Sequence, residues 1–210
     1  MAKVLVNTET LTSIADAIRE KTGTTETLKP GEMADAISSI VGDDLLEAIV
    51  LNINEQDLSN EQAQYIIDTV AAKGSSFKKL RDYLFLSNDT LTKIVIPEGI
   101  KTIGKSCFDG CWYLNDLTIA NTVRIIKERA FAVTNIAVLR LPSSLEQLEK
   151  DCLTGTYTSK VYFNSTPTKL DAAAFSGTSI KDIYVPWAEG AVANAPWGAD
   201  NATVHYNYTE

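Results

Sequence analysis

The feature that most constrains this chain is a repeat of 22 or 23 residues that runs through its second half. Three apolar columns share this period and stay in step, as stacked copies of one structural unit require. The first column comprises Phe85, Phe108, Phe131, Leu153 and Phe175. The second precedes it and comprises Leu80, Ile103, Ile126, Leu148 and Leu170. The third consists of alternating pairs: Ile94 and Ile96, Leu117 and Ile119, Leu139 and Leu141, Val161 and Phe163, and Ile183 and Val185.

The alternating pairs predict one short strand in each repeat, with one face buried. Proline follows three of the pairs and ends the strand, at Pro97, Pro142 and Pro186. A single coil cannot bury its apolar face, whereas stacked coils share a continuous core. We therefore predict an α/β leucine-rich-repeat solenoid of about five coils with short parallel strands, preceded by a small all-α N-terminal region.

Small residues follow the aromatic column and predict a turn in each coil. Next comes a column of small hydrogen-bonding side chains, which we expect to satisfy backbone groups from one coil to the next: Asn88, Cys111, Thr134, Thr156 and Thr178. Cys107 and Cys152 share a position with Ala130 and Ala174, so we interpret them as small buried residues.

A competing interpretation comes from residues 99–106, GIKTIGKS, which fit the phosphate-binding pattern G-x-x-x-x-G-K-[ST]. The repeat argues against it, because Ile103 falls on a core column and the equivalent segments 121–128 and 143–150 lack the glycines. We therefore interpret the match as a coincidence of turn glycines and a surface lysine, and we expect no cofactor.

The two ends of the chain differ from the repeats. Residues 187–208 place Trp187 and Trp197 where earlier coils have an aliphatic residue and Phe, which indicates a C-terminal cap. Short amphipathic helices are predicted near residues 11–23, 30–42, 43–53 and 59–74, the last opened by a capping box of Ser59 and Gln62. We expect three parts: 1–42 as an attachment segment, 43–75 as a helical linker or N-terminal cap, and 76–210 as the solenoid with its cap.

Composition excludes several classes of function. The formal charge of −8 disfavours binding to nucleic acid, and no apolar stretch is long enough for membrane insertion. Neither a signal peptide nor a zinc-binding spacing is visible, so we expect a protein made in the cytoplasm without a metal. The chain has a single histidine, His205, and no paired carboxylates with catalytic spacing. We therefore expect no catalytic residues and no enzyme.

The coil sequence LTKIVIPEGIKTIGKSCFDGCWYLNDLTIA resembles the BspA-type leucine-rich repeats of bacterial surface proteins and phage tail proteins, over residues 77–186. The opening LTSIADAIREKTGTTETLKPGEMADAISSI is similar to the N-terminal segment of minor structural or tail-fibre proteins of phages and prophages of Gram-positive bacteria. The closing residues are similar to the terminal element of those proteins. The resemblance implies an oligomeric virion component of the tail or baseplate. It would contact other tail proteins through residues 1–42 and bind a protein or polysaccharide of the host surface.

A bacterial BspA-like adhesin or protein-interaction module is the alternative. Two groups of residues are candidates for ligand binding in either case. The outward strand positions become rich in types that dominate binding hot spots and stack on sugars, at Arg140, Tyr162 and Tyr184, although plain cross-strand packing would explain them too. Trp112, Tyr113 and Tyr157 lie on the turns after the aromatic column and form a second candidate patch.

Overall fold

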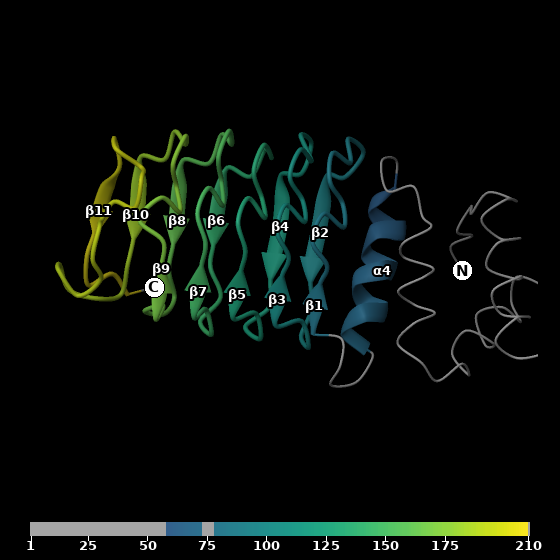
Figure 1. Ribbon diagram of the computed structural model, residues 1–210, viewed down its shortest axis with the longest axis horizontal. Coiled ribbons are helices and arrows are strands. Elements are labelled where there is room, and N and C mark those ends of the chain that lie inside the picture. Colours follow the sequence, from purple (N-terminus) through teal and green to yellow (C-terminus); the bar gives the residue numbers. More distant parts are fainter. Residues whose placement is uncertain (1–57, 73–77, 210) are drawn as a thin grey trace, which may run out of the picture. The chain divides into compact units, whose positions relative to one another are not determined.

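The structure is a computed structural model that describes residues 58–72 and 78–209. These residues belong to one compact unit, Glu55–Glu210, which is a solenoid of parallel strands with about six turns (Figure 1). The predicted leucine-rich-repeat solenoid is therefore confirmed, with about one coil more than the sequence predicted. The predicted helices before residue 58 and the attachment segment 1–42 lie outside the described residues, and the division into three parts stays a prediction.

One side of the solenoid is a five-stranded parallel sheet of two-residue strands. Its strands are β1 (Lys79–Leu80), β3 (Thr102–Ile103), β5 (Ile125–Ile126), β7 (Gln147–Leu148) and β9 (Lys169–Leu170). The second residue of each strand belongs to the apolar column that begins at Leu80. The alternation rule did not reveal these strands, because two residues are too few to show a period of two.

The predicted alternating pairs form the longer strands on the other side. They are β2 (Lys93–Ile96), β4 (Asp116–Ile119), β6 (Val138–Arg140), β8 (Lys160–Tyr162) and β10 (Asp182–Tyr184), and a sixth strand, β11 (Thr203–His205), follows them on the same side. The first two pair with each other, and the last four form a separate sheet in the order β11-β10-β8-β6. The ladder is interrupted between β4 and β6, where the coil shortens from 23 to 22 residues.

The core between the two sides is built from the predicted columns. The rings of Phe85 and Phe108 stack with centroids 5.1 Å apart, and Phe108 stacks on Phe131 at 5.6 Å. All three rings have no exposed surface. Each coil therefore places one large ring on the ring of the preceding coil, which gives the core continuous packing along the solenoid axis.

The coils turn through the left-handed region of the backbone at two columns, the first in four coils and the second in six. The first column has φ between 48° and 62° at Tyr83, Arg129, Asp151 and Ser106. The second column, two residues after the aromatic position, consists of Ser87, Gly110, Val133, Gly155, Gly177 and Gly198. This explains the small residues that the sequence shows there, since most side chains are strained in this conformation.

The hydrogen-bonding column acts mainly within its own coil, so the expectation of bonds between coils holds only in part. Thr134 Oγ1 donates to the Phe131 carbonyl at 2.9 Å, and Thr178 Oγ1 donates to the Phe175 carbonyl at 2.7 Å. Two members of the column also bond outside their own coil: the Cys111 Sγ donates to the Phe85 carbonyl at 3.1 Å, and the Asn88 amide donates to the Leu58 carbonyl at 3.3 Å.

Helix α4 (Asn60–Ala72) covers the N-terminal end of the solenoid (Figure 1). Its apolar face is buried at Ala63, Ile66, Ile67 and Val70. The sequence predicted a helix over these residues. Ser59 precedes its first residue, and the Ser59 carbonyl accepts the first helical bond, from Ala63 N–H at 2.9 Å.

The C-terminal end is closed by Trp197, which is fully buried, and Trp187, which is 6% exposed. Their ring centroids lie 6.0 Å apart in an edge-to-face arrangement, and both rings contact Phe163. The two tryptophans thus pack against the last coil, at the end of the chain where a cap was expected. This end of the chain also contains β11, a strand that the sequence did not indicate. β11 pairs with β10 in register and extends the sheet.

Candidate binding surfaces

Arg140, Tyr162, Tyr184 and His205 form a stacked column on the outer face of the β6-β8-β10-β11 sheet. The parallel register places Arg140 beside Tyr162, Tyr162 beside Tyr184, and Tyr184 beside His205. The Arg140 guanidinium lies 4.3 Å from the centroid of the Tyr162 ring, which is a cation–π distance. The two tyrosine rings stack at 4.5 Å with an interplanar angle of 6°, and Tyr184 stacks on His205 at 4.4 Å.

This stacking decides which part of each ring a ligand could reach. Arg140 and Tyr184 flank Tyr162 on opposite sides, and Tyr162 and His205 flank Tyr184 in the same way. The faces of both tyrosine rings are therefore occupied by their neighbours. The column offers ring edges, the edge of the guanidinium and polar groups, so a sugar cannot stack on the face of either tyrosine.

Two further residues, Tyr208 and Asp182, complete this surface. The ring of Tyr208 contacts the rings of Tyr162 and Tyr184, with its centroid 5.7 Å from that of Tyr162 and 4.9 Å from that of Tyr184. The Asp182 carboxylate lies 2.8 Å from His205 Nε2 and holds the imidazole at the end of the column. Sequence reasoning missed His205, because it comes 21 residues after Tyr184 rather than 22. The closing residues are rich in aromatic side chains, and this was the sequence signal that could have pointed to His205 as part of the column.

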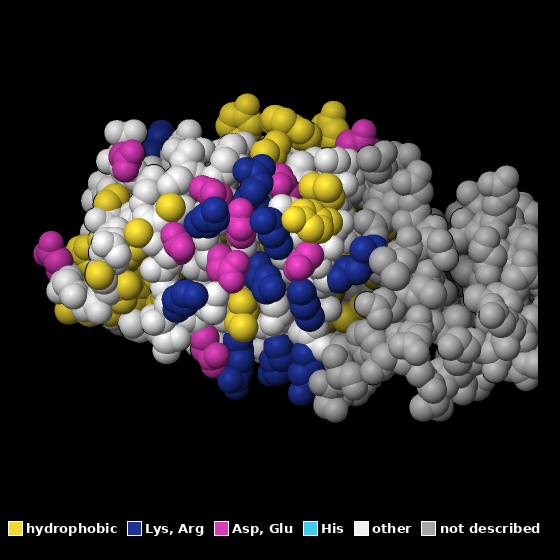
Figure 2. Space-filling view, in the orientation of Figure 1, with side chains coloured by type: hydrophobic (Ala, Val, Ile, Leu, Met, Phe, Trp, Pro, Cys, Tyr) yellow, Lys and Arg dark blue, Asp and Glu magenta, His cyan; other side chains and the backbone are white. Residues whose placement is uncertain are grey.

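Trp112, Tyr113 and Tyr157 lie elsewhere, on the turns that lead into β4 and β8. These turns are at the upper edge in Figure 1, and Figure 2 shows hydrophobic side chains projecting there. The three side chains are 55%, 60% and 71% exposed. The six residues predicted from the sequence therefore belong to two separate surfaces, the stacked column and this edge.

A third surface carries paired charges. Figure 2 shows basic and acidic side chains interspersed over the middle of the face in view. Glu128 lies 3.1 Å from Lys105 Nζ and 3.6 Å from Lys150 Nζ, and Arg129 Nε donates to Asp109 at 2.8 Å. The hydrogen bond from Lys105 lowers the pKa of Glu128 below its ordinary value of 4.5.

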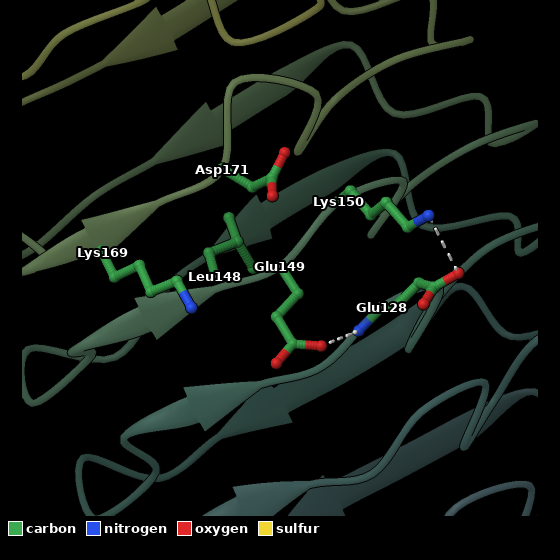
Figure 3. A pocket seen from close by; sticks show the side chains of 6 residues that line it. All are labelled: Glu128, Leu148, Glu149, Lys150, Lys169 and Asp171. Atoms are coloured by element: carbon green, nitrogen blue, oxygen red, sulfur yellow. Dashed lines mark hydrogen bonds and ion pairs between the residues drawn. The ribbon is translucent and has the colours of Figure 1, made fainter.

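A shallow depression of about 180 Å³ opens on this charged surface (Figure 3). Its lining consists of Leu148 and five charged side chains: Glu128, Glu149, Lys150, Lys169 and Asp171. Glu149 accepts from the backbone N–H of Glu128 at 2.9 Å, and Lys150 pairs with the Glu128 carboxylate. Much of this charge is thus used to join neighbouring coils.

The phosphate-loop pattern at residues 99–106 is part of the solenoid wall. Ile103 is fully buried in β3. The N–H of Lys105 donates to Asp82 Oδ1 at 2.8 Å, and the N–H of Ser106 donates to the Glu128 carbonyl at 2.9 Å. Because these amides are already bonded within the protein, they cannot cradle a phosphate.

The remaining sequence features carry no reactive site. Burial raises the pKa of Cys111 and of Cys152 to about 12, and raises the pKa of Cys107 well above its ordinary value of 9.0. Within residues 58–72 and 78–209, no group of three His, Cys, Asp or Glu side chains could hold a metal ion. No helix in this part of the chain combines the length and the apolar character needed to cross a membrane.

Comparison with known proteins identifies the repeats. The sequence model of the family described as BspA type Leucine rich repeat region matches residues 78–191 in six copies. No curated protein sequence matches the chain significantly.

Several solved structures are similar to the solenoid. A leucine-rich-repeat protein of T. pallidum is 19% identical, with a TM-score of 0.50 and 65% of each chain covered. A leucine-rich-repeat protein from Eubacterium ventriosum is 15% identical, with a TM-score of 0.47, 58% of this chain covered and 31% of the other. The pneumococcal vaccine antigen PcpA is 14% identical, with a TM-score of 0.44, 65% of this chain covered and 40% of the other. The chain thus spans less than two thirds of the length of each, and these likenesses concern the fold alone.

Proposed function

The chain belongs to the family of BspA-type leucine-rich-repeat proteins, and from this premise we propose that it is a non-enzymatic binding module. A solenoid of this kind offers an extended, rigid surface built from neighbouring coils, which suits recognition of a macromolecule. Two features support a binding role over catalysis. These are the buried thiols and the bonded amides at residues 105 and 106.

The observation that carries the proposal is the stacked column on the β6-β8-β10-β11 sheet. Stacking fixes the tyrosine side chains before any partner arrives, so little conformational entropy is lost when they are contacted. Tyr and Arg are the types that contribute most to binding hot spots. The column presents ring edges and polar groups, which favours a partner that forms hydrogen bonds along the sheet.

We further propose that this module is a tail or baseplate component of a phage virion and binds the surface of a host cell. The support is the resemblance of residues 11–40 to the N-terminal segments of phage and prophage tail proteins. In this proposal, residues 1–42 attach the chain to other tail proteins and the solenoid contacts the host. The alternative is a bacterial BspA-like adhesin or interaction module, which the family assignment favours equally.

The binding proposal is tested by adsorption of the fluorescently labelled full chain to Gram-positive host-type cells. Replacing both tyrosines, Tyr162→Ala with Tyr184→Ala, removes the stack and should reduce adsorption at least tenfold. The pair Tyr162→Phe with Tyr184→Phe keeps the rings and removes only the hydroxyl groups. It should weaken adsorption while the melting temperature stays within a few degrees of the wild type. Unchanged adsorption of the alanine pair would contradict the role of the column.

The virion proposal has its own test. Mass spectrometry of purified particles from an induced lysogen that carries this sequence should detect the chain in stoichiometric amounts. Its absence from particles, together with its presence on bacterial cells, would favour the adhesin alternative.

A further inference from the structure

We infer that a second site, separate from the stacked column and going beyond the proposed function, binds a neutral polysaccharide. The site is an aromatic ridge that consists of Trp112, Tyr113, Asn135 and Tyr157, which follow one another along the edge that leads into β4, β6 and β8. All four side chains are exposed.

A difference in coil length accompanies the first part of the ridge. The aromatic position and the buried residue that precedes the next strand are six residues apart from Phe108 to Leu114, but five apart from Phe131 to Ile136. The extra residue lies in the turn that holds Trp112 and Tyr113. Because both ends of this turn are buried, at Cys111 and Leu114, the two aromatic side chains project outward.

The backbone beneath the ridge is held firmly. Trp112 N–H donates to the Gly110 carbonyl at 2.9 Å, and Leu114 N–H donates to the Cys111 carbonyl at 3.0 Å. Asn135 N–H donates to the Leu114 carbonyl of the preceding coil at 3.0 Å. Such anchoring lets a ligand meet side chains on a scaffold that is already ordered.

Tyr157 is supported in the same way. It stands between the buried residues Thr156 and Thr158, and Thr158 Oγ1 donates to the Ile136 carbonyl at 2.6 Å. With 71% of its surface exposed, its ring does little to hold the coil together. Among the described residues, no ring contact engages Trp112, Tyr113 or Tyr157, so their faces are open, in contrast to those of the stacked column.

The shape of the ridge indicates a linear ligand. It comprises four side chains on three neighbouring coils, whereas a stable protein interface uses roughly 20–30 residues a side. Trp112 and Tyr157 are two coils apart, which at the strand spacing corresponds to about 10 Å, with the amide of Asn135 between them. Two aromatic platforms separated by a hydrogen-bonding group match the alternating C–H faces and hydroxyl groups of an extended glycan.

The charge of this region indicates that the glycan is neutral. The ridge itself has no ionisable group other than the two phenols. The charged residues nearest to it in sequence are Asp109, Asp116 and Lys160, and the two carboxylates are already paired with Arg129 and Lys93. An anionic polymer would therefore gain little attraction at this edge and would be repelled by the protein's formal charge of −8.

The fluorescence of Trp112 gives a direct test. Trp187 and Trp197 are buried, so Trp112 is the exposed one of the three tryptophans. The full chain is titrated with neutral linear hexasaccharides built from glucose, mannose, galactose or N-acetylglucosamine, and the same set is immobilised on a glycan array. We expect at least one of them to change the Trp112 emission and to bind on the array.

Replacing either platform, by Trp112→Ala or Tyr157→Ala, should weaken array binding at least tenfold without changing the circular dichroism spectrum. Tyr65→Ala serves as the control, because Tyr65 is 60% exposed on α4, away from the ridge, and should bind like the wild type. Failure of every neutral hexasaccharide to bind, or equal binding by all variants, would overturn the inference. Loss of cell adsorption on removal of the stacked column would still support the proposed function in that case.

Discussion

The side-chain amide of Gln64 binds both backbone groups of Val95: Nε2 donates to its carbonyl at 2.8 Å, and Oε1 accepts from its N–H at 2.9 Å. One helical side chain thereby replaces a neighbouring strand at the open edge of β2. Asn60 acts similarly one turn earlier, because its Oδ1 accepts from the N–H groups of Thr92 and Lys93 at 2.9 and 3.2 Å. Helix α4 therefore protects a sheet edge that would otherwise invite pairing with another chain.

We predict that Gln64→Ala destabilises the solenoid by about 1–3 kcal/mol, because it leaves two backbone groups of Val95 without partners. Urea unfolding measures the loss of stability, and hydrogen exchange at Val95 locates it. Gln64→Glu keeps the acceptor and removes the donor, so it should retain more protection at Val95 N–H than the alanine variant. Equal protection in all three proteins would argue against this role.

Gly104→Ala should destabilise the protein by at least about 2 kcal/mol. A Cβ at this position would lie 2.5 Å from the carbonyl carbon of Arg81 and 2.6 Å from the Leu80 carbonyl oxygen, which are backbone atoms that cannot move aside. Gly190→Ala is the matched control. Its Cβ would meet nothing within 4 Å, so only its φ of +82° opposes the change, at about 1 kcal/mol. Thermal unfolding compares the two variants, and similar losses would contradict the steric explanation.

Glu128 should make stability depend on pH in the acid range. Because its pKa in the folded protein lies below the ordinary value of 4.5, its pairing with Lys105 and Lys150 contributes at neutral pH. That contribution is lost as the pH falls below 4.5 through the folded pKa. Glu128→Gln should thus lower the free energy of unfolding measured with urea at pH 7, by less than about 1 kcal/mol for a solvent-screened network, and leave it unchanged near pH 3. A difference that persisted at pH 3 would exclude this cause.

The three cysteines should not react with a thiol-specific disulfide reagent at pH 8 while the protein is folded. The thiolate is the reactive form, and the pKa of Cys111 and of Cys152 is raised to about 12. All three should react at once in guanidinium chloride, which provides the internal standard. Rapid labelling of the native protein would show that the aromatic column opens frequently.

The apolar columns were sufficient to predict the solenoid, because a shared period can be satisfied only by stacking. Phe85, Phe108 and Phe131 contact one another as the period required. The two-residue strands, such as β1, remained hidden because they leave no alternating pattern. The number of coils was underestimated because β11 is out of step with the repeat by one residue.

The sequence placed Tyr162 and Tyr184 on one outward row, but it could not show that their faces cover each other. That property depends on side-chain rotation within the register. In the same way, nothing in the residue order distinguished the covered rings of the stacked column from the open rings of Trp112 and Tyr157. The two surfaces differ in accessibility, which is a property of the folded chain.

The unequal coils have a practical consequence. The corner between Cys111 and Leu114 already accommodates one more residue than its counterpart between Thr134 and Ile136, and β3 nevertheless pairs with β5 in register. Length at this corner is thus uncoupled from pairing in the β1-β3-β5-β7-β9 sheet, and the interruption it accompanies is confined to the opposite side, between β4 and β6. A foreign peptide grafted there would be displayed on a stiff support, which makes the corner a natural position for an engineered recognition loop.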